Sequence, residues 1–210
     1  MSLPVESPVL SKHRLEALAD GIFAFALTLL VLDLRLPALP PGVDDAALRQ
    51  ALAGLLPKAT IWLLSFAVIA ASWVVQQRTF ALLSKIDPDL LRIELILLAL
   101  VSLFPFSQSV QGAYGDLATA SQLYSGHLLC IALCTWRRIA HVLKHHELLL
   151  DAATTATATA KRLRYRSRMF TACAIAALAL AKFWPGWNML AMIPMLLLRW
   201  PRRRSGREDQ

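Results

Sequence analysis

The fold is decided by the stretch RLEALADGIFAFALTLLVLDLRLP, which runs from Arg14 to Pro37. Residues 15–36 carry three acids and one base, and the central residues 21–32 carry neither. With a rise of about 1.5 Å per residue, a helix of this length crosses a hydrocarbon core roughly 30 Å thick. We therefore predict that this stretch forms a membrane-spanning first helix.

Polar side chains interrupt this apolar helix in a specific order. Ionisable groups at membrane depth are costly, so they tend to face protein or water and to mark function. Arg14-x-x-x-Leu18-Ala19-Asp20, followed by an apolar helix containing Thr28, resembles the first-helix signature of the transmembrane protein 175 family of potassium channels, in its prokaryotic form. That signature is Arg-x-x-x-Phe-Ser-Asp, so Arg14 and Asp20 match it, whereas Leu18 and Ala19 depart from it.

The composition indicates a single membrane domain over residues 1–210. Hydrophobic residues make up 57% of the chain, and the mean hydropathy is +0.51, which is too apolar for an ordinary soluble domain. The net charge of +8 follows membrane topology rather than a nucleic-acid surface. No paired catalytic carboxylates, P-loop or dinucleotide fingerprint is present, so we expect neither an enzyme nor a cofactor.

Hydrophobic periodicity predicts an all-α protein with six membrane spans. Their expected bounds are about 12–36, 57–83, 89–110, 120–143, 169–183 and 186–200. Pro105 is expected to kink the third span. The basic segment 144–168 ends in KRLRYRSR, which we expect to contact anionic lipid headgroups. His127, Cys130 and Cys134 share one helical face, but packing explains them better than a metal site does.

The charges set the orientation. All but four of the 22 lysines and arginines fall on one side of this topology, and the four exceptions are Arg35, Arg49, Lys58 and Lys182. The positive-inside rule therefore places both termini in the cytoplasm. The family resemblance implies the same six-helix architecture, one repeat per chain, a homotetramer, and the plasma (inner) membrane of a prokaryote.

One face of the first helix is apolar. At about 100° per residue, Phe25, Leu29 and Leu32 lie on one stripe with Thr28. Periodicity alone favours helix–helix packing for such a stripe. The resemblance instead implies a pore lined by the first helix of each subunit, with these three apolar side chains as the constriction, which can gate ions by dewetting.

Thr28 has two interpretations. Its hydroxyl either bonds the carbonyl of Ala24, four residues earlier, or forms a hydroxyl layer in the pore. No TVGYG stretch occurs in the chain, so selection by a filter of that kind is not available.

A second set of polar groups lies at the depth of Arg14. Family members usually carry Trp-x-x-His in the second span and asparagine in the third, whereas this chain has Trp73, Gln76 and Glu94. A buried arginine needs a carboxylate partner, so we expect Arg14 to pair with Glu94. The alternative is that Glu94 reaches the lipid headgroups.

These features together predict a potassium-conducting cation channel that binds potassium ions and membrane lipids. An ion-coupled secondary transporter is the alternative, because helices interrupted near Pro105 and Pro185 can form a midplane site.

Overall fold

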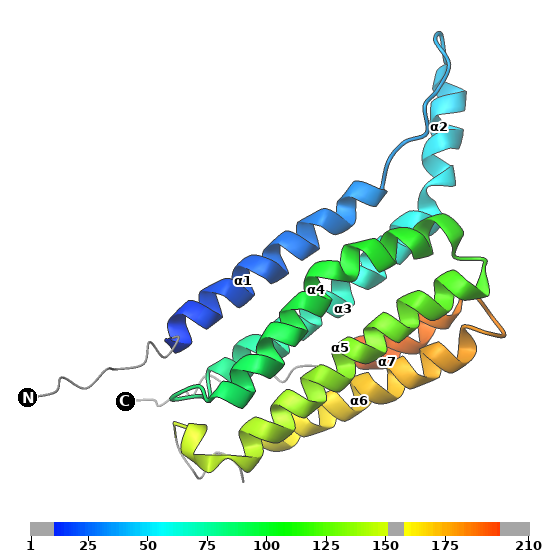
Figure 1. Ribbon diagram of the computed structural model, residues 1–210. Coiled ribbons are helices and arrows are strands. Elements are labelled where there is room, and N and C mark those ends of the chain that lie inside the picture. Colours follow the sequence, from blue (N-terminus) through cyan, green and yellow to red (C-terminus); the bar gives the residue numbers. More distant parts are fainter. Residues whose placement is uncertain (1–10, 151–157, 198–210) are drawn as a thin grey trace, which may run out of the picture.

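The computed structural model describes residues 11–150 and 158–197, and all regular structure in these residues is helical (Figure 1). The elements in chain order are α1 (Lys12–Leu29), η1 (Leu30–Asp33), α2 (Asp45–Gly54), α3 (Leu56–Phe80), α4 (Pro88–Tyr114), α5 (Ala118–Lys144), η2 (His146–Leu148), α6 (Ala158–Leu180), η4 (Asn188–Met192) and α7 (Ile193–Leu197). Outside the described residues lie residues 151–157 of the expected basic segment, residues 198–200 of the expected sixth span, and five of the bases counted for the orientation, between Arg199 and Arg207.

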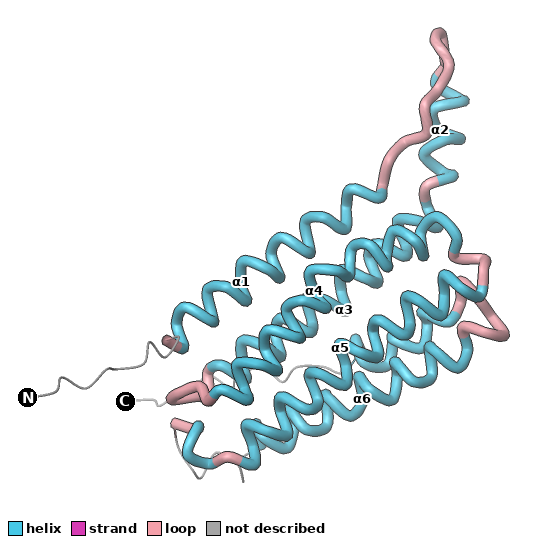
Figure 2. The backbone as a smooth tube through the Cα atoms, in the orientation of Figure 1, coloured by secondary structure: helices cyan, strands magenta, loops and turns pink. Residues whose placement is uncertain are grey.

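The long helices lie side by side in one bundle, and α2 projects away from it (Figure 1). Figure 2 shows that the connecting loops gather at the ends of this bundle. At one end α1, α4 and α6 begin and α3 and α5 finish; we call it the basic end, since Lys12, Lys85, Lys144 and Arg164 lie there. The Lys12 ammonium donates to the carbonyl of Leu83 at 2.7 Å, which joins α1 to the loop after α3.

Caps and prolines set several helix starts. Asp44 and Asp87 accept hydrogen bonds from the backbone N–H groups of Ala47 and Leu90, each at 2.8 Å, so they cap α2 and α4. Pro88 stands in the first turn of α4, where no intrahelical N–H is needed.

Several helix bounds differ from the predicted ones. α4 continues through Pro105 to Tyr114, four residues beyond the predicted end of the third span. The helix of the fifth span, α6, begins at Ala158 and so extends back into the basic segment, where alanine, lysine, arginine and leucine all favour a helix. The first span finishes in the short η1 turn at Asp33 instead of at Leu36.

Within the described residues, three helical segments are long and apolar enough to cross a membrane: Lys12–Asp33, Leu56–Phe80 and Pro88–Tyr114. α5 has 27 residues and α6 has 23, but polar and basic side chains reduce their hydropathy. The remaining apolar segment, Asn188–Leu197, is shorter. The count of six spans therefore stays a prediction.

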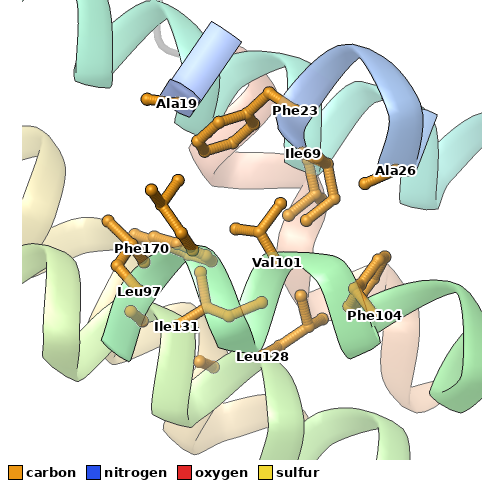
Figure 3. Packing of buried hydrophobic residues seen from close by; sticks show 14 of the residues in the cluster. Ala19, Phe23, Ala26, Ile69, Leu97, Val101, Phe104, Leu128, Ile131 and Phe170 are labelled. Atoms are coloured by element: carbon orange, nitrogen blue, oxygen red, sulfur yellow. The ribbon is translucent and has the colours of Figure 1, made fainter. Parts of the chain in front are cut away.

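The core forms where α1 and α3 meet α4, α5 and α6. Figure 3 shows the side chains of these helices converging there. The labelled core residues are Ala19, Phe23 and Ala26 of α1, Ile69 of α3, Leu97, Val101 and Phe104 of α4, Leu128 and Ile131 of α5, and Phe170 of α6, all of them buried.

Candidate functional site

α1 carries two stripes with different surroundings. One stripe is buried and consists of Leu15, Ala19, Phe23, Ala26 and Leu30. The other is exposed and consists of Leu18, Gly21, Phe25, Thr28 and Leu32. We call the second set the exposed stripe. Its members recur at alternating intervals of three and four residues, which is the spacing of one helix face.

The predicted constriction residues fall on this stripe or at its edge. The exposed fraction is 65% for Phe25 and 53% for Leu32, so neither side chain contributes to the core of a single chain. Leu29 is half-buried and turns toward α4. The two residues that depart from the family signature lie on different faces of α1. Leu18 is on the exposed stripe, and Ala19 packs in the core.

Thr28 lies on the exposed stripe between Phe25 and Leu32. Its hydroxyl donates to the carbonyl of Phe25, three residues back, at 2.8 Å. The first of the two interpretations named the carbonyl of Ala24 instead. Thr28 as a residue is exposed. Its hydroxyl proton is engaged, but the oxygen keeps lone pairs that can accept a hydrogen bond or contact a cation.

Asp20 fastens α1 to α3. The indole N–H of Trp73 donates to Asp20 Oδ1 at 2.9 Å, and the amide of Gln77 donates to the same oxygen. Asp20 and Trp73 were expected site residues, whereas Gln77 was not. A signal was available, since Gln77 follows Trp73 by four residues and therefore lies on the same face of α3.

The predicted pair between Arg14 and Glu94 is wrong. Arg14 is exposed near the start of α1. Glu94 instead accepts from Nη1 of Arg138 on α5 at 2.9 Å, and the amide of Gln76 donates to its other oxygen at 2.8 Å. The side chain of Arg138 is 0% exposed and that of Glu94 is 1% exposed.

Glu94 pairs with Arg138 because of the face of α4 on which it lies. Glu94 shares a buried face of α4 with Leu90, Leu97 and Val101, and that face packs on α5. A buried arginine on α5 must find a carboxylate, and Glu94 is the one within reach. Arg138 also donates to the hydroxyl of Thr79 at 3.4 Å, so the network joins α3, α4 and α5.

From the sequence, Arg138 was counted among the bases on the cytoplasmic side. Its spacing contained a contrary signal, since Ile131, Thr135, Arg138 and Val142 recur at intervals of three and four and are all buried. Arg137, one residue earlier, is exposed.

A second carboxylate anchors the other end of the first span. Ser109 on α4 donates to Asp33 Oδ1 at 3.0 Å, and Asp33 Oδ2 lies against Gly112. A cavity of about 350 Å³ opens beside this contact. It is lined by Leu29, Leu32, Asp33, Arg35, Pro105, Gln108 and Ser109.

The histidines of α5 make ordinary structural contacts. The ring of His127 bonds Ser107 Oγ at 2.8 Å and the carbonyl of Leu100 at 2.9 Å. His141 bonds Asp87 at 2.9 Å at the basic end. Burial raises the pKa of Asp87, but hydrogen bonds from the Leu90 N–H and from His141 outweigh burial and hold that pKa below its usual value. The described residues contain no group of three or more potential metal ligands.

Comparison with known proteins agrees with the first-helix signature. A family model described as "Endosomal/lysosomal potassium channel TMEM175" matches residues 14–105. A potassium channel of Chamaesiphon minutus is 33% identical over 166 residues, which cover 77% of this chain and 81% of that protein. The chain belongs to the transmembrane protein 175 family. The predicted resemblance is therefore confirmed, and the family is one of membrane proteins rather than an enzyme class.

A second relative and two solved structures are also similar to this chain. A potassium channel of Streptomyces collinus is 31% identical over 157 residues, covering 72% of this chain and 74% of that protein. The crystal structure of a lysosomal potassium-selective channel TMEM175 homologue from Chamaesiphon minutus superposes with a TM-score of 0.72 at 27% identity, over 88% of this chain and 94% of that one. The crystal structure of the MtTMEM175 T38A variant shares the fold, with a TM-score of 0.59 at 15% identity over 93% of each chain.

Proposed function

We propose that this chain is a subunit of a potassium-conducting cation channel whose pore is lined by α1. The relatives that bear the name potassium channel support the class of activity. The observation that carries the proposal is the exposed stripe on α1, which presents apolar side chains and one hydroxyl on a helix with the family signature. Family membership does not favour the ion-coupled transporter.

The stripe matches the requirements of a gate that closes by dewetting. Phe25 and Leu32 are seven residues apart, which separates them by about 10 Å along a helix axis. Copies of these side chains around a common axis would enclose a narrow apolar segment that excludes water and therefore ions. The hydroxyl of Thr28 lies between them and would offer an oxygen ligand to a partly dehydrated cation.

The proposed assembly is a homotetramer with six spans per chain and both termini in the cytoplasm, in a prokaryotic plasma membrane. The distribution of bases supports this orientation, because Lys12, Lys85 and Lys144 are at the basic end while Arg35 is at the opposite end. Potassium is the permeant ion.

The test compares two phenylalanines with similar exposure. Phe25→Ala is expected to wet the constriction and raise basal potassium flux into liposomes. Phe106→Ala on α4 is the matched control, since Phe106 is 59% exposed and lies off the exposed stripe of α1. Equal flux in the two variants, with equal protein incorporation, would remove α1 from the pore.

Thr28→Val in the same liposomes separates the hydroxyl from the shape of the side chain. If the hydroxyl layer helps to select the ion, the potassium-to-sodium permeability ratio from reversal potentials falls toward one. An unchanged ratio would limit Thr28 to its bond with the Phe25 carbonyl and leave the apolar gate in place.

A further inference from the structure

A groove follows the contact between α5 and α6 from the basic end toward the middle of the bundle. It consists of two adjoining cavities, one of about 310 Å³ and one of about 280 Å³. Both are lined by Trp136 of α5 and Arg168 of α6, so they form one continuous depression. We call it the α5–α6 groove.

The cavity nearer the basic end is cationic. Its lining includes Lys144, Arg164 and Arg168, all of them exposed. None of the ion pairs between residues of the described part of the chain involves these three side chains. Three cations that line one cavity, with no carboxylate among the described residues of its lining, form a suitable site for a phosphate group, which accepts several charge-assisted hydrogen bonds.

The deeper cavity is apolar. Leu133, Trp136, Ala172 and Ile175 line it, and each of these side chains is exposed. Leu133 precedes Lys144 by eleven residues on α5, so the groove is about 16 Å long along the helix axis. That length accommodates a substantial part of an acyl chain. Trp136 stands where the cationic and apolar parts meet, as aromatic residues do at membrane interfaces.

We propose that the α5–α6 groove binds one anionic phospholipid. Its phosphate lies among Lys144, Arg164 and Arg168, and one acyl chain follows Leu133 and Ile175. Basic pockets between membrane helices on the cytoplasmic side are known to hold such headgroups. A free phosphate ion would leave the apolar half unused. The proposal rests on the orientation proposed above, which puts the basic end at a membrane surface, and it is independent of the path that potassium takes.

The binding test uses the purified full chain in zwitterionic detergent micelles, with phosphatidylglycerol as the probe. A groove variant, Lys144→Gln with Arg164→Gln and Arg168→Gln, is compared with a control variant, Arg137→Gln with Lys161→Gln and Arg162→Gln. Both lose three charges, and the control bases are exposed but do not line the groove. Each groove base is expected to contribute about fivefold in affinity, so the groove variant binds on the order of 100-fold more weakly.

The outcomes of that titration are distinct. A large loss confined to the groove variant supports the site, and an equal loss in both variants overturns it, because that result means diffuse attraction to a basic surface. Inorganic phosphate and phosphatidylcholine are titrated in parallel. Binding of inorganic phosphate with the affinity of phosphatidylglycerol would also overturn the proposal, since the acyl chain would then contribute nothing.

A second readout places the acyl chain. Phosphatidylglycerol brominated on its acyl chain is expected to quench Trp136 fluorescence, measured as the difference between the wild type and Trp136→Phe. Brominated phosphatidylcholine at the same mole fraction should quench this residue less, and the groove variant should remove the preference. Equal quenching by both lipids refutes the site. Potassium flux is measured separately, in purely zwitterionic liposomes. A failure of the channel proposal can therefore be distinguished from a failure of the lipid-binding proposal.

Discussion

The buried pair of Glu94 and Arg138 allows a quantitative test of how the helices are joined. Two unit charges about 4 Å apart attract by about 4 kcal/mol at an effective dielectric constant of 20. Removing one member of a buried pair leaves the other charge uncompensated and typically costs about 3–5 kcal/mol. We therefore expect Arg138→Met to destabilise the fold by about that much. Arg137→Met changes an exposed neighbour on the same helix and should cost under about 1 kcal/mol.

The double variant Glu94→Gln with Arg138→Met isolates the interaction. The new glutamine still has a carbonyl to accept from the Gln76 amide, so that hydrogen bond is kept while both charges are removed. The free energy of unfolding, from detergent titration followed by circular dichroism, should recover by about 2 kcal/mol or more relative to the sum of the single variants. Additive single effects would mean that the two side chains are not coupled. A large loss of unfolding free energy in Arg14→Met would instead support the pair of Arg14 with Glu94 that the sequence suggested.

Two further predictions concern contacts near the ends of the helices. Gly112→Ala would place a methyl group against the Asp33 carboxylate and should lower the free energy of unfolding by about 1–3 kcal/mol. Gly126→Ala is the control, because there is open space around Gly126 and no such loss is expected. Adding Asp33→Ala to Gly112→Ala should recover part of the lost stability, since it removes the carboxylate that the methyl group meets. Because the pKa of Asp87 is lowered in the folded protein from 3.8, its stabilising contribution is present above that value and is lost as the pH falls through the folded pKa. Asp87→Asn should therefore flatten the decline of the unfolding midpoint as the pH falls below about 4.

The sequence predicted local features better than partners. Apolar length located the first three spans. Asp87 and Pro88 carry a further local signal for the start of α4, since a cap and a first-turn proline act within a few residues of themselves. The predicted ends of helices were wrong where no such local signal marks them. The third span was expected to contain Pro105, as α4 does, but α4 ends at Tyr114 rather than at residue 110.

Partners across helices could not be read from the chain in the same way. The need of a buried arginine for a carboxylate was correctly expected, but Arg14 was chosen where Arg138 is the partner. Periodicity gives the angle between residues on one helix and says nothing about which neighbouring helix a face meets. Only the packing of α4 on α5 decides between the two arginines.

The two carboxylates at the ends of the first span explain how its exposed stripe is oriented. Asp20 is held by Trp73 and Gln77 of α3, and Asp33 is held by Ser109 of α4. The carboxylates are thirteen residues apart, or about 20 Å along a helix, and they bind to different helices. A helix fixed near both ends against two neighbours cannot rotate about its own axis without breaking a charge-assisted hydrogen bond. Costly carboxylates at membrane depth therefore have a clear role here: they hold Phe25, Thr28 and Leu32, which lie between them, on the face that packs against neither partner helix.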